Sequence, residues 1–363
     1  MDNILILPGG LQIGGAEKIA ADISKYAPKG KYCFHYIVFE GLDNVYGAEI
    51  ESRGGKVFTI PSPSKGYKQY RRFLGDLMDK YHYKAVHSHT MFNSGINLSV
   101  AKKHGVPIRI CHSHTTKTET NISFKRNMYH KYMRRMILNN ATDLFACGVE
   151  AGNWLYGETE FKKRGKVIHN GIDVDLFAYN ETNRQEIRKK LGLEGKFVIG
   201  HTGHFYPVKN QIFLINLMPE IIKNNKDAVL IFLGDGHDRK ILEDRISELK
   251  LKNNVVLYGS TRDVNRFYSA VDVFAFPSLR EGAPLALIEA QTNGLPCIIS
   301  SAIPNDAILT DLVTPVDLQN KEKWVSQIIS ASRKNASEYA GIIKKSGYSS
   351  QSTVEAIYEA YDR

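Results

Sequence analysis

Residues 197–210 read FVIGHTGHFYPVKN, and this stretch decides the fold. An apolar run at 197–201 leads through a glycine turn into a helical pattern at 211–224. The stretch restarts a rhythm that already extends from residue 4 to residue 168, in which brief apolar runs bounded by Gly and Pro alternate with amphipathic segments. Such a rhythm is typical of parallel sheets covered by helices on both faces. The sequence therefore predicts two successive doubly wound, Rossmann-like α/β units.

The predicted strands are short and regularly spaced. They cover residues 4–7, 36–39, 57–60, 85–87, 108–111, 144–147 and 167–168, and then 197–201, 229–233, 255–258, 271–276 and 297–300. Predicted helices include residues 16–26, 67–81, 93–104, 124–139, 211–224, 238–251 and 284–293. The polar stretch 170–194 is expected to hold the joint, which gives domains 1–175 and 176–349. Ligands of such sheets bind beyond the carboxyl ends of the strands, so we expect a site in a cleft between the domains.

Length and charge agree with two domains of unequal character. The chain has 363 residues, and domains average roughly 150. Residues 1–175 hold 25 Lys+Arg and 16 Asp+Glu (25 − 16 = +9), and residues 176–363 hold 23 and 22 (23 − 22 = +1). The excess in the first half predicts an anionic partner there, such as nucleic acid, a membrane surface or phosphate. A composition of 43% hydrophobic and 24% charged residues excludes a disordered or disulfide-scaffold chain.

Cysteine usage and the N-terminus indicate a compartment. Cys33, Cys111, Cys147 and Cys297 form no CxxC pair, which argues against a zinc ribbon or a redox dithiol. The opening MDNILILPGG lacks the features of a signal peptide, and no run approaches the roughly 20 apolar residues that span a bilayer. We therefore expect a cytoplasmic protein that is soluble or peripheral to the membrane.

Glycines after the first predicted strand suggest a phosphate site. Gly14 and Gly15 precede a helix, where backbone amides and the helix N-terminus attract phosphate. The spacing differs from GxGxxG. Glu40, however, ends the second strand where a dehydrogenase places its ribose-binding acid, so an NAD(P)-dependent oxidoreductase remains an alternative.

Four histidines end two predicted strands of the first half. A metal site there is conceivable, but few carboxylates or cysteines lie nearby to complete it, and we expect none. For His87 we expect an ordinary hydrogen-bonded histidine. For His114 we favour contact with phosphate or sugar hydroxyls. The set is His87, His89, His112 and His114.

The second half carries a lysine and two glutamates at junctions of strand and helix. Lys209 enters a helix near its N-terminus, where it can form a diphosphate site, although a solvated lysine is an equal alternative. Glu281 and Glu289 lie in PSLREGAPLALIEAQTNGLP, residues 277–296. Glu289 sits among apolar residues, which is costly unless the carboxylate is hydrogen-bonded, and sugar hydroxyls would serve. Salt bridges or helix capping are the alternatives for either glutamate alone.

Residues 124–138, FKRNMYHKYMRRMIL, predict a basic amphipathic helix. Aromatic residues and methionines gather on one side, and Arg126, Arg134 and Arg135 belong to the other. This combination suits an anionic membrane surface. A packed helix with a solvated basic face is an equal alternative. Nucleic acid is not expected, because no recognition motif accompanies the charge.

The chain resembles the retaining glycosyltransferases of family 4, which have the two-domain GT-B fold, and is similar to those of bacterial exopolysaccharide and capsule synthesis. The resemblance spans nearly the whole chain. Its marks are GGAE at 14–17, HSHT at 112–115, HNGID at 169–173, GHFYPVKN at 203–210, LGDG at 233–236 and the segment 277–296, which holds the family's E-x7-E as Glu281 and Glu289.

The resemblance implies roles for the donor site. Lys209 would neutralise the diphosphate, Glu281 would hold the sugar, and Glu289 would bind the ribose hydroxyls. The backbone of Gly14 and Gly15 would approach the diphosphate, the backbone from Gly282 through Ala283 and Pro284 to Leu285 would assist Glu281, and Tyr258 and Arg262 would border the base. His114 would lie by the transferring sugar, with His112 and His89 on the acceptor side. Residues 350–363 would pack back on the first domain.

One departure concerns His204, where the family commonly has an arginine that shares the diphosphate. Histidine is a weaker and pH-dependent substitute. Separately, the DxD at Asp173 and Asp175 falls in the predicted link between domains and is interpreted as turn chemistry.

The expected activity is transfer of a sugar, with retention, from a UDP-linked donor to a lipid-linked or oligosaccharide acceptor. We expect no metal or other cofactor, and a location on the inner face of the plasma membrane. A non-catalytic nucleotide-sugar binding module, and an epimerase or hydrolase on the same fold, remain alternatives.

Overall fold

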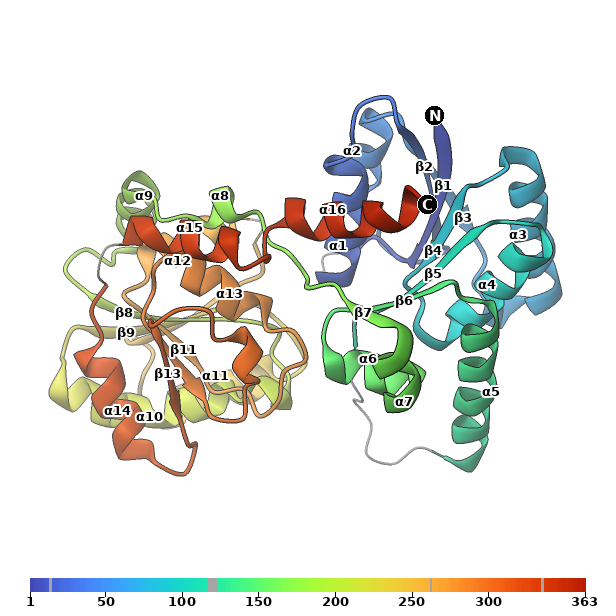
Figure 1. The fold of residues 1–363 in the computed structure, drawn as a ribbon. Coiled ribbons are helices and arrows are strands. Elements are labelled where there is room, and N and C mark those ends of the chain that lie inside the picture. Colours follow the sequence, from blue (N-terminus) through green and yellow to red (C-terminus); the bar gives the residue numbers. More distant parts are fainter. Residues whose placement is uncertain (13–14, 116–122, 262, 334–335) are drawn as a thin grey trace. The chain divides into compact units, whose positions relative to one another are not determined.

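A computed structural model describes residues 1–12, 15–115, 123–261, 263–333 and 336–363 (Figure 1). The chain divides into two compact units, Met1–Gly171 with Ser350–Arg363, and Ile172–Ser349. Gly14 and Arg262, both expected in the donor site, lie outside the described residues. Two α/β units with parallel sheets confirm the predicted fold class.

The first unit holds a parallel sheet in the order β3-β2-β1-β4-β5-β6-β7. Its strands are β1 (Asp2–Gly9), β2 (Tyr32–Phe39), β3 (Lys56–Ile60), β4 (Ala85–Ser88), β5 (Ile108–Ser113), β6 (Asp143–Ala146) and β7 (Gly165–Val167). Its helices are α1 (Gly15–Lys25), α2 (Gly47–Ser52), α3 (Tyr67–Tyr81), α4 (Ser94–Lys103), α5 (Phe124–Asn140), α6 (Val149–Tyr156), α7 (Glu158–Arg164) and α16 (Ser350–Tyr361).

The second unit holds a parallel sheet in the order β10-β9-β8-β11-β12-β13. Its strands are β8 (Phe197–Thr202), β9 (Ala228–Leu233), β10 (Val255–Gly259), β11 (Val273–Phe276), β12 (Cys297–Ser300) and β13 (Val313–Val316). Its helices are α8 (Val174–Phe177), α9 (Glu181–Leu191), α10 (Gln211–Asn224), α11 (Arg239–Glu248), α12 (Val264–Ala270), α13 (Leu285–Thr292), α14 (Lys321–Ser330) and α15 (Ala336–Lys345).

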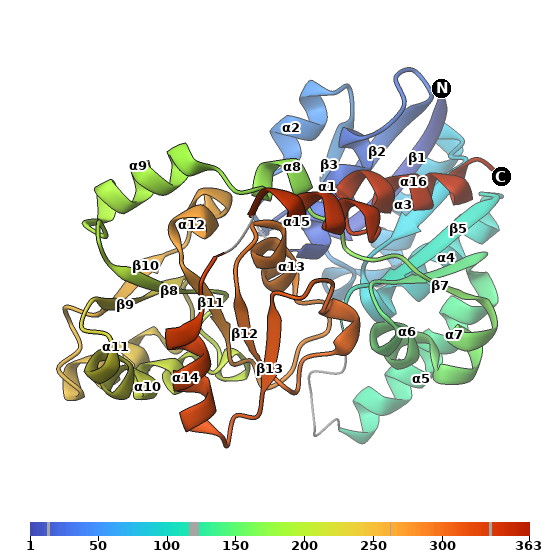
Figure 2. The same ribbon diagram turned by 60° about the vertical axis from the view of Figure 1, so that its left-hand side comes forward.

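Each strand of the second sheet supplies two cores, because successive side chains point to opposite faces. In β9, Ile231 packs toward a core that includes α12 and α13, whereas Phe232 packs toward a core that includes α10, α11 and α14. Figure 2 shows these two groups of helices on opposite sides of the strands. The continuous apolar runs at 229–233 and 273–276 are explained by burial on both faces.

The boundary between the units differs from the predicted one. It lies between Gly171 and Ile172 rather than after residue 175. Ile172 and Val174 are buried in the core of the second unit, and the Ile172 amide donates to the Tyr348 carbonyl at 2.9 Å. Packing therefore assigns residues 172–175 to the second unit.

The C-terminal helix α16 belongs to the first unit. Val354, Ile357 and Tyr361 are each 0% exposed, in one core with strands β1 and β2. The Thr353 hydroxyl donates to the His169 carbonyl at 2.8 Å. The end of the chain thus completes the core of the unit in which the chain begins.

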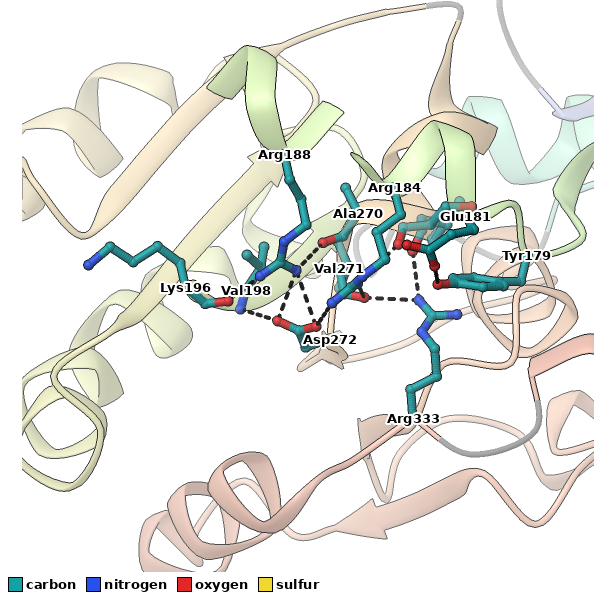
Figure 3. A network of polar contacts seen from close by, with 12 residues as sticks. Tyr179, Glu181, Arg184, Arg188, Lys196, Val198, Ala270, Val271, Asp272 and Arg333 are labelled. Carbon is teal, nitrogen blue, oxygen red and sulfur yellow. Dashed lines mark hydrogen bonds and ion pairs between the residues drawn. The ribbon is translucent and has the colours of Figure 1, made fainter. Parts of the chain in front are cut away.

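An acidic side chain at the start of the second sheet binds two arginines, and a third arginine lies nearby (Figure 3). Asp272, just before β11, accepts hydrogen bonds from Arg184 and Arg188 of α9 and from the Val198 amide of β8. Arg333 donates nearby to the Val271 carbonyl at 2.9 Å. This network attaches α9 to the amino edge of the sheet, opposite the edge where ligands of such folds bind.

Candidate functional site

Both sheets reverse their strand order at one place, which marks the expected ligand position. In the second unit the neighbours at the reversal are β8 and β11. The loop after β8 carries Lys209, in a short 3₁₀-helix (Pro207–Lys209), and the loop after β11 carries Glu281. Asn210, at the left-handed φ of 55°, joins the two loops by donating to the Pro277 carbonyl at 3.2 Å.

Lys209 and Glu281 form an ion pair. Lys209 Nζ lies 2.7 Å from Glu281 Oε1, and the side chains are 22% and 10% exposed. The ammonium also lies 5.4 Å from the ring centroid of Phe276, within cation–π range. The structure thus brings together two residues that are 72 positions apart in the sequence and that the sequence assigns to one site.

Glu289 lies on α13, which begins after Pro284. Its Oε2 accepts a hydrogen bond at 2.9 Å from the hydroxyl of Tyr268, which is fully buried. Burial, and then the adjacent Glu289 carboxylate, raise the pKa of Tyr268 well above its usual range. Tyr268 therefore remains a donor that orients Glu289, a function that sequence reasoning missed because the helical pattern around residue 268 carries no motif.

The glycines of LGDG, residues 233–236, allow two loops to approach closely. A Cβ on Gly234 would lie 2.1 Å from the Gly203 carbonyl oxygen, and Gly234 has a φ of 147°. Only glycine fits such a contact and conformation. This approach holds the loop that begins at Gly203 and carries Lys209.

The other residues expected in the donor site are exposed, make local contacts or line a pocket. His204 is exposed, and its carbonyl accepts from Gln211 at 3.0 Å. The Leu285 amide donates to the Ala283 carbonyl at 2.9 Å, so it is engaged locally. A pocket of about 170 Å³ includes Tyr258 in its lining, together with Glu186, Ile187, Lys190, Leu191, Thr261, Asp263, Arg266 and Phe267.

In the first unit, the strands at the reversal are β1 and β4, and Gly15 begins α1 after β1. Four histidine side chains lie in β4 and β5 or directly after them. His89 Nδ1 lies 2.7 Å from His114 Nε2, and His87 Nε2 lies 3.2 Å from His112 Nδ1. The four, His87, His89, His112 and His114, are termed the histidine array.

The array is more buried than the sequence suggests. His87 and His112 are 0% exposed and His89 is 7% exposed; His87 lies within β4 as predicted, whereas β5 extends beyond the predicted 108–111 and includes His112. His112 thus has no exposed surface with which to contact an acceptor. His114 is half-buried beside Asn170.

The three arginines of the predicted basic face of α5 differ in their exposure. Arg126 and Arg135 are exposed. Arg134 is not free to face a membrane, because its guanidinium donates to the carbonyls of Trp154 and Leu155 near the C-terminal end of α6. Such carbonyls lack partners within their helix and attract a cation. Arg134 therefore differs in its surroundings from Arg126 and Arg135, which are exposed as predicted.

Comparisons with known proteins identify the family. A model of group 1 glycosyl transferases matches residues 183–349, and a model of glycosyltransferase family 4 matches residues 13–176. The putative glycosyltransferase EpsF of Bacillus subtilis is 32% identical over 99% of this chain and 96% of its own length. The chain belongs to the group 1 and family 4 glycosyltransferases.

One further relative and one solved structure of similar fold are informative. An Escherichia coli UDP-Gal:alpha-D-GlcNAc-diphosphoundecaprenol alpha-1,3-galactosyltransferase is 31% identical over 65% of this chain and 62% of its own. HepE of Anabaena, solved with UDP, has a TM-score of 0.81 at 19% identity, with 100% of both chains covered. The latter similarity confirms the GT-B fold.

The glycosyltransferase should lose stability in mild acid. Burial lowers the pKa of His87 to about 3 and those of His114 and His201 to about 4. Below about pH 6.5 the unfolded chain binds protons that the folded chain excludes, so the free energy of unfolding falls as the pH falls. Each histidine contributes up to about 1.4 kcal/mol per pH unit.

Urea unfolding at pH 7, 6 and 5 measures this slope, in a range where most carboxylates of the unfolded chain remain ionised. The variant His237→Gln, whose imidazole is exposed, should show the same slope. A free energy of unfolding that is constant between pH 7 and pH 5 would contradict the burial of these histidines.

Proposed function

We propose that this glycosyltransferase moves a sugar, with retention, from a UDP-linked donor to a lipid-linked or oligosaccharide acceptor in bacterial exopolysaccharide or capsule synthesis. The Lys209–Glu281 pair at the strand-order reversal carries the proposal, with Glu289 following on α13. Its relatives support it: one is named for UDP-Gal and a diphosphoundecaprenol-linked sugar, and HepE has been solved with UDP-glucose. A capsular polysaccharide glycosyltransferase of Staphylococcus aureus is 28% identical over 80% of this chain.

In the proposed chemistry, the charges of Lys209 and Glu281 are already in position before the donor reacts. The bond between the anomeric carbon and the diphosphate oxygen breaks, while the acceptor oxygen bonds to the same face of that carbon. The leaving phosphate oxygen takes the acceptor proton. Lys209 stabilises the charge that develops on the diphosphate, and Glu281 orients the sugar through its hydroxyls.

Glu289 is proposed to accept hydrogen bonds from the ribose hydroxyls, with Tyr268 holding its carboxylate. The pocket that includes Tyr258 is proposed to border the base. His114, beside Asn170, is proposed to contact the transferring sugar.

The transfer is proposed to need no metal. Asp173 caps α8 by accepting from the Leu176 amide, and Asp175 pairs with Lys344 at 3.2 Å, so the DxD serves local structure. Transfer should therefore be unchanged by EDTA, as measured by initial rates of nucleoside diphosphate release with acceptor present. Activity that disappears with EDTA and returns with Mn²⁺ would contradict this.

A thermal-shift screen of nucleotide sugars, followed by a product assay, tests the function. A UDP-sugar should raise the melting temperature, and glycosylated product should form only with acceptor. Stabilisation without turnover would indicate a binding module, and turnover without acceptor would indicate a hydrolase or epimerase. Stabilisation by NAD(P)H instead would favour the oxidoreductase.

We also propose that α5 docks on the anionic inner face of the plasma membrane. Phe124, Met128 and Tyr132 are 80%, 53% and 62% exposed, at a helical spacing of four. The first unit holds 26 Lys+Arg and 17 Asp+Glu (26 − 17 = +9), which complements anionic lipid. No described helix is both long and apolar enough to span a bilayer.

Neutralising α5 should weaken vesicle binding. Flotation with phosphatidylglycerol vesicles should give at least about tenfold weaker binding for R126Q/R135Q, since each cation near the surface contributes about 1 kcal/mol. The matched control is Lys196→Gln in the second unit, which should bind as the wild type does. Unchanged binding of R126Q/R135Q would remove α5 from the proposal.

A further inference from the structure

We propose that His87, His89 and His112 of the histidine array form a binding site for a divalent transition-metal ion such as Zn²⁺. One ligand nitrogen from each lies within 4.8 Å of the others. All three side chains are at least nine-tenths buried. A tetrahedral ion with Zn–N distances of about 2.0–2.1 Å needs nitrogens about 3.3 Å apart, so the imidazoles have to approach one another and turn from their stacked arrangement to bind it. His87 Nε2 and His112 Nδ1 are already 3.2 Å apart.

Hydrogen bonds determine which nitrogen of His89 is available. Asn170 Oδ1 is an acceptor, so His114 Nδ1, at 3.3 Å, carries a proton and donates to it. The Nε2 of a neutral His114 then accepts from His89 Nδ1 at 2.7 Å. His89 Nε2 is left with its lone pair, and this buried atom has no hydrogen-bond partner within the described part of the chain.

A hydrogen bond also determines which nitrogen of His87 is available to a metal ion. Its Nδ1 lies 2.7 Å from the Tyr361 hydroxyl of α16. When that oxygen accepts the Nδ1 proton, Nε2 presents a lone pair toward His112. Metal-ligating histidines almost always have their other nitrogen held by such a hydrogen bond. Tyr361 and His114 thus support the two histidines of β4.

His112 offers either of its nitrogens. Nδ1 faces His87, and Nε2 is buried with no hydrogen-bond partner among the residues that the structure describes. A buried polar atom without a partner costs free energy that a bound ion would recover. Three histidines with a water molecule in the fourth position form the ligand set of a known class of zinc sites.

The protonation state suits an ion at neutral pH. Burial lowers the pKa of His87 to about 3, and it lowers the pKa values of His89 and His112 well below the usual range. The neutral imidazole is the form that binds metal, so binding displaces no proton at pH 7.

Co²⁺ titration of the full chain, without an affinity tag and stripped with a chelator, tests the site. We expect one Co²⁺ per chain with the visible absorption of tetrahedral coordination, displaced by Zn²⁺, and a melting temperature raised by several degrees with Zn²⁺. His89→Gln should weaken Co²⁺ binding by at least about tenfold. The control His237→Gln, an exposed histidine of the second unit, should bind as the wild type does.

Tyr361→Phe provides a second readout, because it keeps the ring in the core and removes only the hydroxyl beside His87. It should weaken Co²⁺ binding about 10- to 100-fold. Circular dichroism of each variant without metal verifies folding. Absence of a tetrahedral spectrum in the wild type, or equal affinity in folded His89→Gln, would overturn the proposal, whatever the outcome for sugar transfer.

Discussion

Replacing Glu281 or Lys209 should lower the rate of sugar transfer by about 10²- to 10³-fold, the effect of removing one preorganised charge from a transition state. Glu281→Ala deletes the carboxylate that would orient the sugar. Lys209→Ala deletes the cation that would stabilise the departing diphosphate. Initial rates of product formation at saturating donor measure the loss.

A matched lysine of the same unit controls for nonspecific effects. Lys196 pairs with Asp227 at 2.7 Å, and both side chains are substantially exposed. Lys196→Ala should change the rate by less than about twofold, since exposed ion pairs contribute little. Because Lys209 and Glu281 are a partly buried pair, Glu281→Gln should be measured too, as it keeps the side-chain volume. Wild-type rates in Glu281→Ala and Lys209→Ala would mean that the site is elsewhere.

Asp272→Ala should lower the free energy of unfolding by up to about 3–5 kcal/mol, the cost of removing one partner from a fully buried ion pair, since Asp272 is only 19% exposed. The substitution leaves Arg184 and Arg188, which are 23% and 11% exposed, without their carboxylate and frees the Val198 amide (Figure 3). Urea unfolding of the full chain measures the difference.

Asp227→Ala is the corresponding surface control. Its partner Lys196 has a side chain that is 39% exposed, so water can solvate the ammonium and the change should stay within about 1 kcal/mol. If Asp272→Ala costs no more than Asp227→Ala, the arginines are not held by this carboxylate and α9 is anchored by packing alone.

Periodicity located much of the fold. The bounds of α3 and α10 agree with the predicted segments 67–81 and 211–224, because each is a long amphipathic pattern with a clear stop. Strand β13 was not predicted, since it is short and contains Pro315, which a strand tolerates at the edge of a sheet.

The candidate site, like the fold, could be predicted only in part from the sequence. Lys209 and Glu281 could be assigned to one place because carboxyl ends of parallel strands meet. The side of α5 that Arg134 occupies could not be found, because a helical wheel does not reveal the carbonyls of α6. The sequence does contain a sign of the histidine array, because His-Ser-His-Thr occurs at both 87–90 and 112–115. The repeat predicts a cluster of histidines only once β4 and β5 are known to be neighbours in the sheet.

The position of α16 in the first unit determines which of the two units can complete its core first during synthesis. During synthesis the chain emerges from its N-terminus, and the core around β1 and β2 lacks Val354, Ile357 and Tyr361 until residues 350–361 have left the ribosome. The second unit, Ile172–Ser349, is contiguous and can close first. The unit whose synthesis begins first is therefore completed after the second unit, and its core lacks these three apolar side chains until α16 has emerged.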